Sequence, residues 1–579
     1  MEELLALKPL ETHGVSVKCL RDIGQTLLNI LARTSWALNM LDATSKIPSG
    51  ILVGNVMEFG NYDQCLDVKV NKPWGSFTGQ HCLVLLPISP QSFNFSSALL
   101  QGSDLDYISL GLSLCIPSTC KPEDLQYGLS FINKNLTVSP LLCHTQDEPP
   151  LQTIEWIAIY VLISLVVLCV FSTSYDLLFT EKDKHNKLLT TFSVYTNGKN
   201  LFTTESSSGS LEALHGIRFL SIVWILEGHV MMFVTQTPSI NFLQSLELGR
   251  TWLHTISESA PFAIDTFLLM SGLLISYVFM NSMKSGKKFN ILLYYLHRLV
   301  RIMPVLGLLT LIQVSIVRRM GYGPLYEFAV TKKIIEPCVD YWWTTLLHVQ
   351  NYVNPLKVCV PTSWYLAVDL QLYLISPIIL FGLLKKTRIT YVFICTASLI
   401  GIIIIFIQSS LTEISPNYVH INLQMPASFY YTHMRYVPWL IGIILGYILH
   451  ETTAWRSEVK FGLSRLSKVI VTCGWLFAIL CTVGSIISIH PFSQKDYVYN
   501  PIEASLYFAL TRPLWSLGVA WIIFACVSGY GGILNAILSW PGFRPLSRLT
   551  FCIYLLNFQI LGFMVFTLKV NPYINSINQ

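Results

Sequence analysis

The feature that most constrains this chain is a series of long apolar segments separated by short polar ones. A helix needs roughly 20 apolar residues to cross a hydrocarbon core about 30 Å thick. Only 12% of the 579 residues are charged, whereas about a quarter are charged in an ordinary soluble protein. The sequence therefore predicts an all-α polytopic membrane protein with about 10–11 transmembrane helices. The predicted spans cover residues 153–173, 214–236, 261–281, 299–317, 364–384, 389–408, 435–450, 468–489, 505–527 and 550–568.

The basic residues indicate how these spans are oriented. The net charge of +5 does not point to nucleic acid, because Lys and Arg form short clusters between apolar segments rather than one basic face. Cytoplasmic loops are enriched in Lys and Arg, and the clusters occupy alternate loops, which places residues 1–150 outside the cytoplasm. The loop at 528–549 contains an apolar stretch, Ile533 to Trp540, that could re-enter the bilayer, so the side of the C-terminus stays open. The clusters are Lys182/Lys184/Lys187, Lys284/Lys287/Lys288, Lys385/Lys386/Arg388, Arg456/Lys460/Arg465 and Arg544/Arg548.

Cysteines mark the N-terminal region as a disulfide-rich domain. An even count in such a region indicates a disulfide framework in an oxidising compartment. The alternative is free thiols or zinc ligands, but no tight Cys-x-x-Cys pair is present. Six cysteines allow fifteen connectivities, so the pairing stays open. These six are Cys19, Cys65, Cys82, Cys115, Cys120 and Cys143, and a further pair, Cys338 and Cys359, shares one loop that the orientation also places outside.

Other signals in this region agree with an extracytoplasmic location. Two Asn-x-Ser/Thr sequons, at Asn94 and Asn135, are candidate glycosylation sites. A short helical pattern (Leu20, Ile23, Leu27, Ile30, Leu31) is followed by Gly, Pro and Asn turns, which predicts a small loop-rich domain. Residues 1–30 lack the apolar core of a secretory signal, so we expect the true start to lie upstream. The predicted domains are residues 1–150, residues 151–213 with the first span and a cytoplasmic linker, and residues 214–579, in a plasma membrane or an endomembrane of the secretory route.

Ionisable residues inside the spans are candidate functional residues, because each costs roughly 2.5–3.5 kcal/mol to insert. Arg218 and His229 are eleven residues apart, which returns a helix to within about 20° of its starting direction and separates them by about 16 Å along one face. His229 could instead be a core histidine hydrogen-bonded to another helix. Arg298 and Arg301 lie three residues apart, and a pair of guanidinium forks suits phosphate groups. They could equally be positive-inside anchors.

Two carboxylates, Asp265 and Asp369, each begin a span from the outer side. A buried carboxylate either pairs with an intramembrane Arg or His or orients an imidazole that acts as a general base. The histidines are scattered over different segments and no His/Cys pair shows ligand spacing, so no metal site is predicted. These scattered histidines are His215, His229, His254, His297 and His348.

At these positions the chain resembles the acyltransferase-3 superfamily of membrane proteins and, within it, the nose-resistant-to-fluoxetine-like proteins of nematodes and arthropods. The resemblance covers nearly the whole chain. It implies an integral membrane enzyme that moves acyl groups, generally from acyl-CoA, to hydroxyl acceptors, with no tightly bound cofactor. The motifs that carry it are ALNMLDATSKIPSGILVGN, GNYDQCL, GIRFLSIVWILEGH, AIDTFLLMSGLLISY, HRLVRIMP, YWWTTLLHVQNY, WYLAVDLQLYLISP and PLSRLTFCIYLLN.

The resemblance also implies roles for the intramembrane residues. Arg298 and Arg301 would hold the phosphates of an acyl-CoA that enters from the cytoplasm, with Arg218 beside them. His229 would deprotonate the acceptor hydroxyl or briefly carry the acyl group. The chain departs from the family at Asn557, where a Tyr-Leu-Val-His-Pro pattern usually has His, and at Glu227, where a small or apolar residue is usual. Neither departure is expected to touch the four main positions.

Two alternatives to an enzyme remain. The animal subfamily is associated with movement of lipids and xenobiotics, so the intramembrane charges could line a permeation path for a lipophilic ligand. The chain could also be an acyltransferase-like scaffold that has lost activity, as Asn557 suggests. The expected partners are membrane lipid, acyl-CoA and a hydroxyl acceptor whose identity the sequence does not give.

Overall fold

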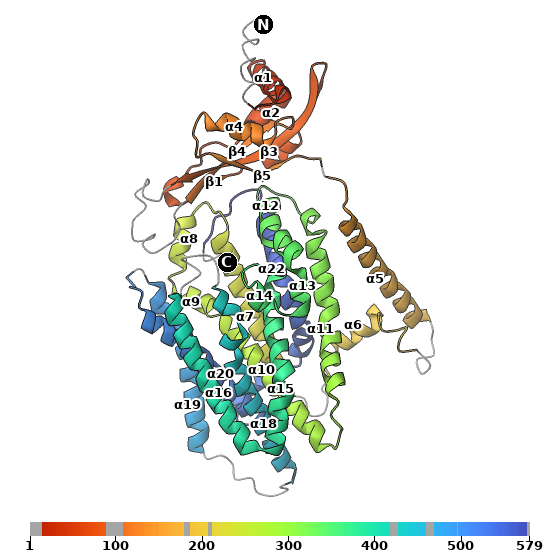
Figure 1. The fold of residues 1–579 in the computed structure, drawn as a ribbon, viewed down its shortest axis with the longest axis vertical. Helices are drawn as coiled ribbons and strands as arrows, with labels where there is room; N and C mark the ends of the chain where they lie inside the picture. Colours follow the sequence, from red (N-terminus) through yellow and green to blue (C-terminus); the bar gives the residue numbers. More distant parts are fainter. Residues whose placement is uncertain are drawn as a thin grey trace.

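The computed structural model describes residues 14–88, 108–147, 149–178, 186–205, 211–416, 426–458, 468–494 and 496–575. A small mixed domain stands at one end of a long helical body (Figure 1). We call the side of this domain the outer side and the opposite side the inner side. The sequon at Asn94 and the basic residues Lys182, Lys184, Lys460 and Arg465 lie outside the described residues, whereas Asn135 is exposed in the turn before the last strand of the small domain.

The small domain, which we call the outer domain, contains a sheet that the sequence did not predict. The predicted helical pattern forms α1 (Val17–Leu31), and its buried face consists of Cys19, Asp22 and Thr26 rather than its leucines. The strands are β1 (Met57–Glu58), β2 (Lys69–Lys72), β3 (Gly75–Ile88), β4 (Ile108–Pro117) and β5 (Thr137–His144). They pair in the order β1-β4-β3-β2, with β5 against β3. The other helices are α2 (Ser35–Ala43), α3 (Tyr62–Leu66) and α4 (Pro122–Ser130).

Three disulfides cross-link the outer domain: one joins α1 to the turn after β4, one joins α3 to β4, and one joins two strands. Among the fifteen possible connectivities, the structure has Cys19–Cys120, Cys65–Cys115 and Cys82–Cys143. The last of these joins paired residues of β3 and β5. A disulfide removes conformational freedom mainly from the unfolded chain, and such bonds persist in the oxidising compartments where extracytoplasmic domains fold. The expected disulfide framework is therefore present.

The helical body confirms a polytopic membrane protein. Within the described residues, nine helices are long and apolar enough to cross a membrane, fewer than the 10–11 expected. The predicted span at residues 435–450, which is not among these nine, is also helical, as α18 (Tyr436–Glu458). The other long helices are α5 (Thr153–Leu178), α7 (Ala213–Gln236), α10 (Pro261–Lys284), α11 (Ile291–Val314), α15 (Trp364–Lys385), α16 (Thr387–Thr412), α19 (Lys468–Ile487), α20 (Pro501–Ser528) and α22 (Phe543–Phe566).

Short elements join the long helices. The ambiguous segment after α20 forms only a seven-residue helix, α21 (Gly532–Leu538), which packs at the inner end of α7 and is too short to span. A short helix, α6 (Val194–Phe202), lies near the inner end of α7, and another, α8 (Phe242–Leu248), lies near its outer end. The remaining short elements, on the outer side, are α9 (Trp252–Glu258), α12 (Tyr326–Val330), the π-helical turn η6 (Thr331–Ile335), α13 (Glu336–Leu347) and α14 (Gln350–Val353).

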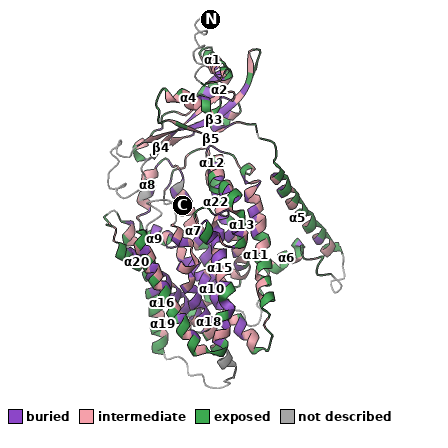
Figure 2. Cartoon of the chain, in the orientation of Figure 1, coloured by how far each residue is buried: buried purple, intermediate pink, exposed green. Residues whose placement is uncertain are grey.

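The core of the body is built around α10 and α18, which approach each other closely. A Cβ on Gly272 would lie 2.2 Å from the Trp439 carbonyl oxygen, and one on Gly442 would lie 2.1 Å from that of Leu269. Small residues allow such contact between helices in lipid, where packing replaces the hydrophobic effect. Figure 2 shows buried residues concentrated on α10, α15 and α18, whereas α5 stands apart and is exposed along its length. Such exposure suits a helix surrounded by lipid.

The C-terminus lies on the outer side, which settles a question that the sequence left open. After α22 the chain returns to the outer domain, where Lys569 Nζ lies 2.7 Å from both carboxylate oxygens of Asp63. Asn571 Nδ2 donates to the Met57 carbonyl at 2.5 Å. His144 of β5 lies 3.6 Å from the Glu327 carboxylate on α12. The outer domain is therefore docked on the body through α12 and the C-terminal segment.

Candidate functional site

His229 on α7 and Asn557 on α22 form a hydrogen-bonded pair in the interior of the body. The Asn557 amide nitrogen donates to the carbonyl oxygens of Ile553 at 3.1 Å and Tyr554 at 2.6 Å. Its oxygen therefore faces His229 Nδ1, 2.5 Å away, and can only accept. The hydrogen-bond network thus assigns the proton to Nδ1 and leaves a lone pair on Nε2. An imidazole in this tautomer can act as a general base.

This contact corrects one expectation from the sequence. Asn557 was expected not to touch the main functional positions, yet it is the direct partner of His229. The sequence contained the signal, because Asn557 stands where the related family usually has His. Only the packing of α22 against α7 shows that the departure affects the candidate base itself.

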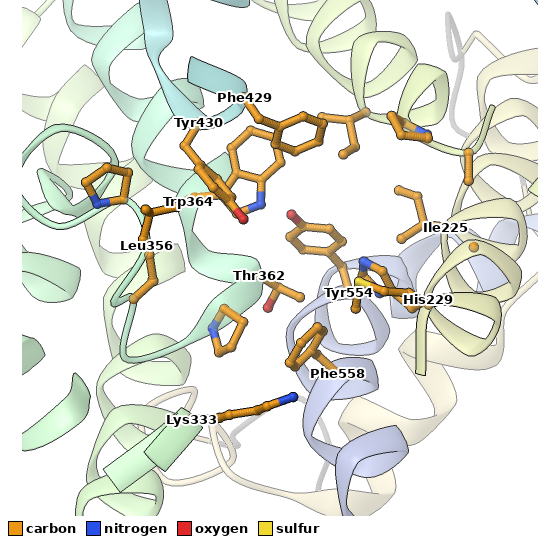
Figure 3. A pocket seen from close by; sticks show the side chains of 18 of the residues that line it. Ile225, His229, Lys333, Leu356, Thr362, Trp364, Phe429, Tyr430, Tyr554 and Phe558 are labelled. Carbon is orange, nitrogen blue, oxygen red and sulfur yellow. The ribbon is translucent and has the colours of Figure 1, made fainter. Parts of the chain in front are cut away.

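His229 lines a cavity of about 720 Å³ in the body, within the size range of small-molecule sites. Figure 3 shows His229 beside Tyr554, with the hydroxyl groups of Tyr430 and Tyr554 facing the centre of the cavity. Much of the wall is apolar, including Ile225, Leu356, Trp364, Phe429 and Phe558. A cavity with apolar walls and few polar groups can exclude water from the reacting atoms. The sequence had singled out none of the residues of this wall.

Charged residues gather where the outer short helices border the cavity. Lys332, Lys333, Glu336 and Asp340 come from η6 and α13, and Lys357 follows α14. Lys332 Nζ lies 2.6 Å from Glu336 Oε1. Burial lowers the pKa of Lys333, and its ammonium group points toward Phe558 (Figure 3). One end of the cavity is therefore polar and lies toward the outer side.

The predicted arginine pair is divided between two environments. Arg298 on α11 is ion-paired with Asp369 on α15, and Ser271 Oγ on α10 donates to the same carboxylate at 2.5 Å. The guanidinium carbon of Arg298 lies 4.5 Å from the centre of the Tyr373 ring. Arg301, by contrast, is exposed. The Arg298–Asp369 pair therefore ties three helices together, one of the two uses expected for an intramembrane carboxylate.

Arg218, Arg298 and Arg301 lie near one another but not in the cavity wall. Arg218 and Arg301 are close enough for their charges to repel each other, and Tyr365 lies close to both Arg218 and Arg298. The Tyr365 ring packs edge-on against Tyr554 at 5.6 Å between centres. Tyr554 in turn lines the cavity with His229. The two tyrosines therefore stand between the arginine cluster and the cavity.

The second carboxylate, Asp265, is also paired. Asp265 Oδ1 lies 3.4 Å from Arg435 Nη1, and neither side chain is exposed. Arg435 Nε also donates to the Phe429 carbonyl at 3.0 Å, and its guanidinium carbon lies 4.0 Å from the centre of the Phe429 ring. Because Phe429 lines the cavity, this buried pair positions part of the wall. Asp265 does not orient His229, whose Nδ1 is hydrogen-bonded to Asn557.

Another buried histidine, His348, closes α13 in the left-handed region (φ 56°). Burial and the nearby charge of Arg298 lower the pKa of His348 to about 4, so it is neutral at physiological pH. The backbone carbonyl of His348 accepts from Gln371 Nε2 at 2.9 Å. Cys338 and Cys359 form a disulfide in the same outer region. Among the described residues no group of three His, Cys, Asp or Glu side chains could hold a metal ion.

Fold and site together define a polytopic membrane protein with a histidine in a cavity of its helical body, an arginine cluster nearby and a disulfide domain at the outer end. Comparison with known families makes this class specific. The family model for the acyltransferase domain of the acyltransferase-3 type matches residues 211–577. The model for the N-terminal domain of the nose resistant-to-fluoxetine protein matches residues 19–129. The chain belongs to the acyltransferase-3 family, and its acyltransferase domain follows a nose-resistant-to-fluoxetine N-terminal domain.

Curated relatives agree with this assignment. The chain is 28% identical over 595 aligned positions to Nose resistant to fluoxetine protein 6 of Caenorhabditis elegans, covering 90% of this chain and 71% of the relative. It is 23% identical over 302 positions to the O-acetyltransferase OatA of Staphylococcus aureus, covering 50% of this chain and 42% of that protein. No solved structure matches the chain. The resemblance drawn from the motifs is confirmed.

Proposed function

We propose that this protein transfers an acyl group from acyl-CoA to a hydroxyl acceptor, with His229 as the general base. The observation that carries the proposal is the His229–Asn557 pair in the wall of the 720 Å³ cavity. Membership of the acyltransferase-3 family supports the reaction class, as does the similarity to an O-acetyltransferase. The acyl donor and the acceptor are our proposal.

The chemistry follows from the tautomer of His229. Nε2 takes the proton of the acceptor hydroxyl as its oxygen attacks the thioester carbonyl. The carbon–sulfur bond then breaks, and the departing thiolate of CoA receives the proton from Nε2. Asn557 accepts a hydrogen bond from Nδ1 throughout, which keeps the imidazole oriented and stabilises the transient imidazolium. A neutral amide supplies less stabilisation than a carboxylate would, but it fixes the same tautomer.

The arginine cluster supports a donor site on the inner side. Arg298 is already paired with Asp369, so its charge is less available to a phosphate. Arg301 is exposed and Arg218 is partly exposed, and guanidinium groups bind phosphates well. In the proposal Arg218 and Arg301 therefore contact the phosphates, while Arg298 holds the helices that position them. The donor then approaches from the side of the arginines and the acceptor from the outer cavity.

The test is acyl-CoA turnover by the purified full chain in nanodiscs. His229→Ala should lower turnover by about 10²–10⁴-fold, the usual contribution of a general base. The matched control is His433→Ala, since His433 does not line the cavity. Asn557→Leu should give a smaller loss, because the base remains but its tautomer is no longer held.

One result would sink the proposal: full turnover in His229→Ala with the melting temperature of wild type. Saturable lipid binding by wild type without any turnover would instead favour a carrier. The assay therefore separates the enzyme from the transport protein that the subfamily association suggests.

A further inference from the structure

The short helix α9 presents one polar face to the cavity, which the proposed chemistry does not use. His254, Ser257 and Glu258 all line the cavity. Their spacing of i, i+3 and i+4 places them on one side of the helix. His254 and Ser257 are buried, at 4% and 7% exposure, and the side chain of Glu258 is 3% exposed. Polar groups buried in this way are costly unless they have partners.

Each member of this face is held in place by a neighbour. His254 Nε2 lies 3.6 Å from Glu258 Oε1. Ser493 Oγ donates to the other Glu258 oxygen at 2.8 Å. Ser257 Oγ donates to the Glu227 carboxylate on α7. The face is therefore a pre-arranged set of hydrogen-bonding groups rather than a row of mobile side chains.

This arrangement gives Glu227 a function. The Glu227 carboxylate accepts the hydrogen bond of Ser257 and so orients its hydroxyl group. The helices α7 and α9 are in close contact here, because a Cβ on Gly228 would lie 3.4 Å from the Ser257 carbonyl oxygen. Gly228 directly precedes His229. The polar face of α9 is thus anchored beside the candidate base by Glu227 of α7.

The charges around the cavity disfavour an anionic occupant at this face. Glu258 lies on it and Glu227 lies behind Ser257, so a phosphate placed there would meet two carboxylates. Among the cavity lysines, which come from η6 and the segment after α14 rather than from α9, Lys332 is already paired with Glu336. A hydroxyl group, by contrast, can donate to a carboxylate or to the Ser257 oxygen, whose own proton is given to Glu227, and can accept from an imidazole N–H.

The rest of the cavity is suited to hydrocarbon. Leu356, Trp364, Phe429 and Phe558 contribute apolar wall, and burying a hydrocarbon chain there gains roughly 25 cal/mol per Å². We infer that the α9 face of His254, Ser257 and Glu258 binds the uncharged, hydroxyl-bearing head of a lipid acceptor whose chain lies along the apolar wall. This inference rests on the proposed function in one respect, since it names the bound lipid as the acceptor of the acyl group. Binding of that lipid can be measured without any turnover.

The experiment measures binding of radiolabelled monopalmitoylglycerol to the purified full chain in phosphatidylcholine nanodiscs, with no acyl donor present. Wild type should bind saturably. Palmitoyl lysophosphatidic acid, which has the same chain but an anionic head, and free glycerol, which has no chain, should compete at least tenfold more weakly. Ser257→Ala and Glu227→Ala should each weaken binding by about tenfold, as expected for a lost buried hydrogen bond.

The matched control is Ser259→Ala, because Ser259 is a buried serine next to this helix that does not line the cavity. It should bind like wild type, and His254→Gln should retain part of the affinity because an amide can replace one hydrogen bond. Equal binding by wild type, Ser257→Ala and Glu227→Ala would overturn the inference, and so would competition by palmitoyl-CoA at concentrations where monopalmitoylglycerol fails. Binding that behaves as expected without acyl-CoA turnover would leave the site intact and refute only the proposed acyl transfer.

Discussion

The outer domain and the helical body satisfy buried charges in different ways. In the outer domain Asp22 is buried but accepts hydrogen bonds from the exposed Arg21 and from Thr119, and covalent bonds hold the fold together. In the body, Asp265 and Arg435 are both fully buried and face each other. The cysteines within the described spans are all free thiols, so no disulfide joins these helices to one another. Between the long helices of the body, ion pairs thus take the role that disulfides have in the outer domain, and the Cys338–Cys359 disulfide of the body lies among its short outer elements.

The difference follows from the surroundings of each region. A small domain in water stabilises itself by limiting its unfolded chain, and an oxidising compartment permits this. In lipid, helices gain little from hydrophobic burial against one another, so packing and polar contacts hold them together. A buried pair in lipid specifies one arrangement, because either partner alone would be an uncompensated charge. Three substitutions test whether the two regions depend on these different devices.

The largest effect on stability is expected in the body. Asp265→Asn leaves Arg435 buried without its counter-charge, which should lower the free energy of unfolding by about 3–5 kcal/mol. Thermal unfolding of the purified chain in detergent measures the change, with Asp340→Asn as control, since Asp340 is exposed. The double variant Asp265→Leu/Arg435→Met should recover most of the loss. A double variant less stable than Asp265→Asn would show that the ion pair stabilises the fold by more than the neutralisation of one buried charge by the other.

In the outer domain the corresponding change is removal of a disulfide. Cys65→Ser with Cys115→Ser opens a link between residues 50 apart, which should destabilise this domain by about 4 kcal/mol. Hydrogen exchange should rise in β3 and β4 while the helices of the body stay protected. Cys552→Ser, a change at an exposed free cysteine of the body, serves as control. Equal loss of protection in both regions would mean that the body depends on the outer domain to fold.

The smallest of the three effects concerns pH and involves His81 in β3. Burial lowers the pKa of His81 from its usual 6.5 to about 4. Between these values the unfolded state binds more protons than the folded state, so stability falls as the pH drops from 6.5 toward 4. The loss should approach about 3 kcal/mol.

Chemical unfolding of the outer domain at pH 7 and pH 4.5 measures this dependence. His81→Phe should remove the part due to His81 and leave the dependence from other groups. The same pH dependence in wild type and His81→Phe would contradict the assignment. The ring of His81 packs edge-on against Tyr62 at 5.0 Å between centres, so Phe preserves an aromatic contact there.

Much of the fold could be predicted from the sequence because lipid imposes strict requirements. Every predicted span is helical, since backbone groups in a hydrocarbon core must be satisfied within the segment. The sheet of the outer domain was not predicted, because it forms by pairing of strands that are distant from one another in the sequence, such as β3 with β4. The leucines of α1 predicted its helix but not its packing, since its buried face is polar.

For the site, the sequence by itself determined which residues were chemically unusual. Arg218, His229, Arg298 and Asp369 stand out because ionisable groups are expensive in lipid. Only the tertiary structure decided how they combine: Arg298 with Asp369, His229 with Asn557, and neither pair within one helix. Periodicity reports the face of a helix but not which helix that face meets. The partner of each side chain is therefore set by packing between segments that lie 71 and 328 residues apart in the sequence, and so is the cavity that His229 lines.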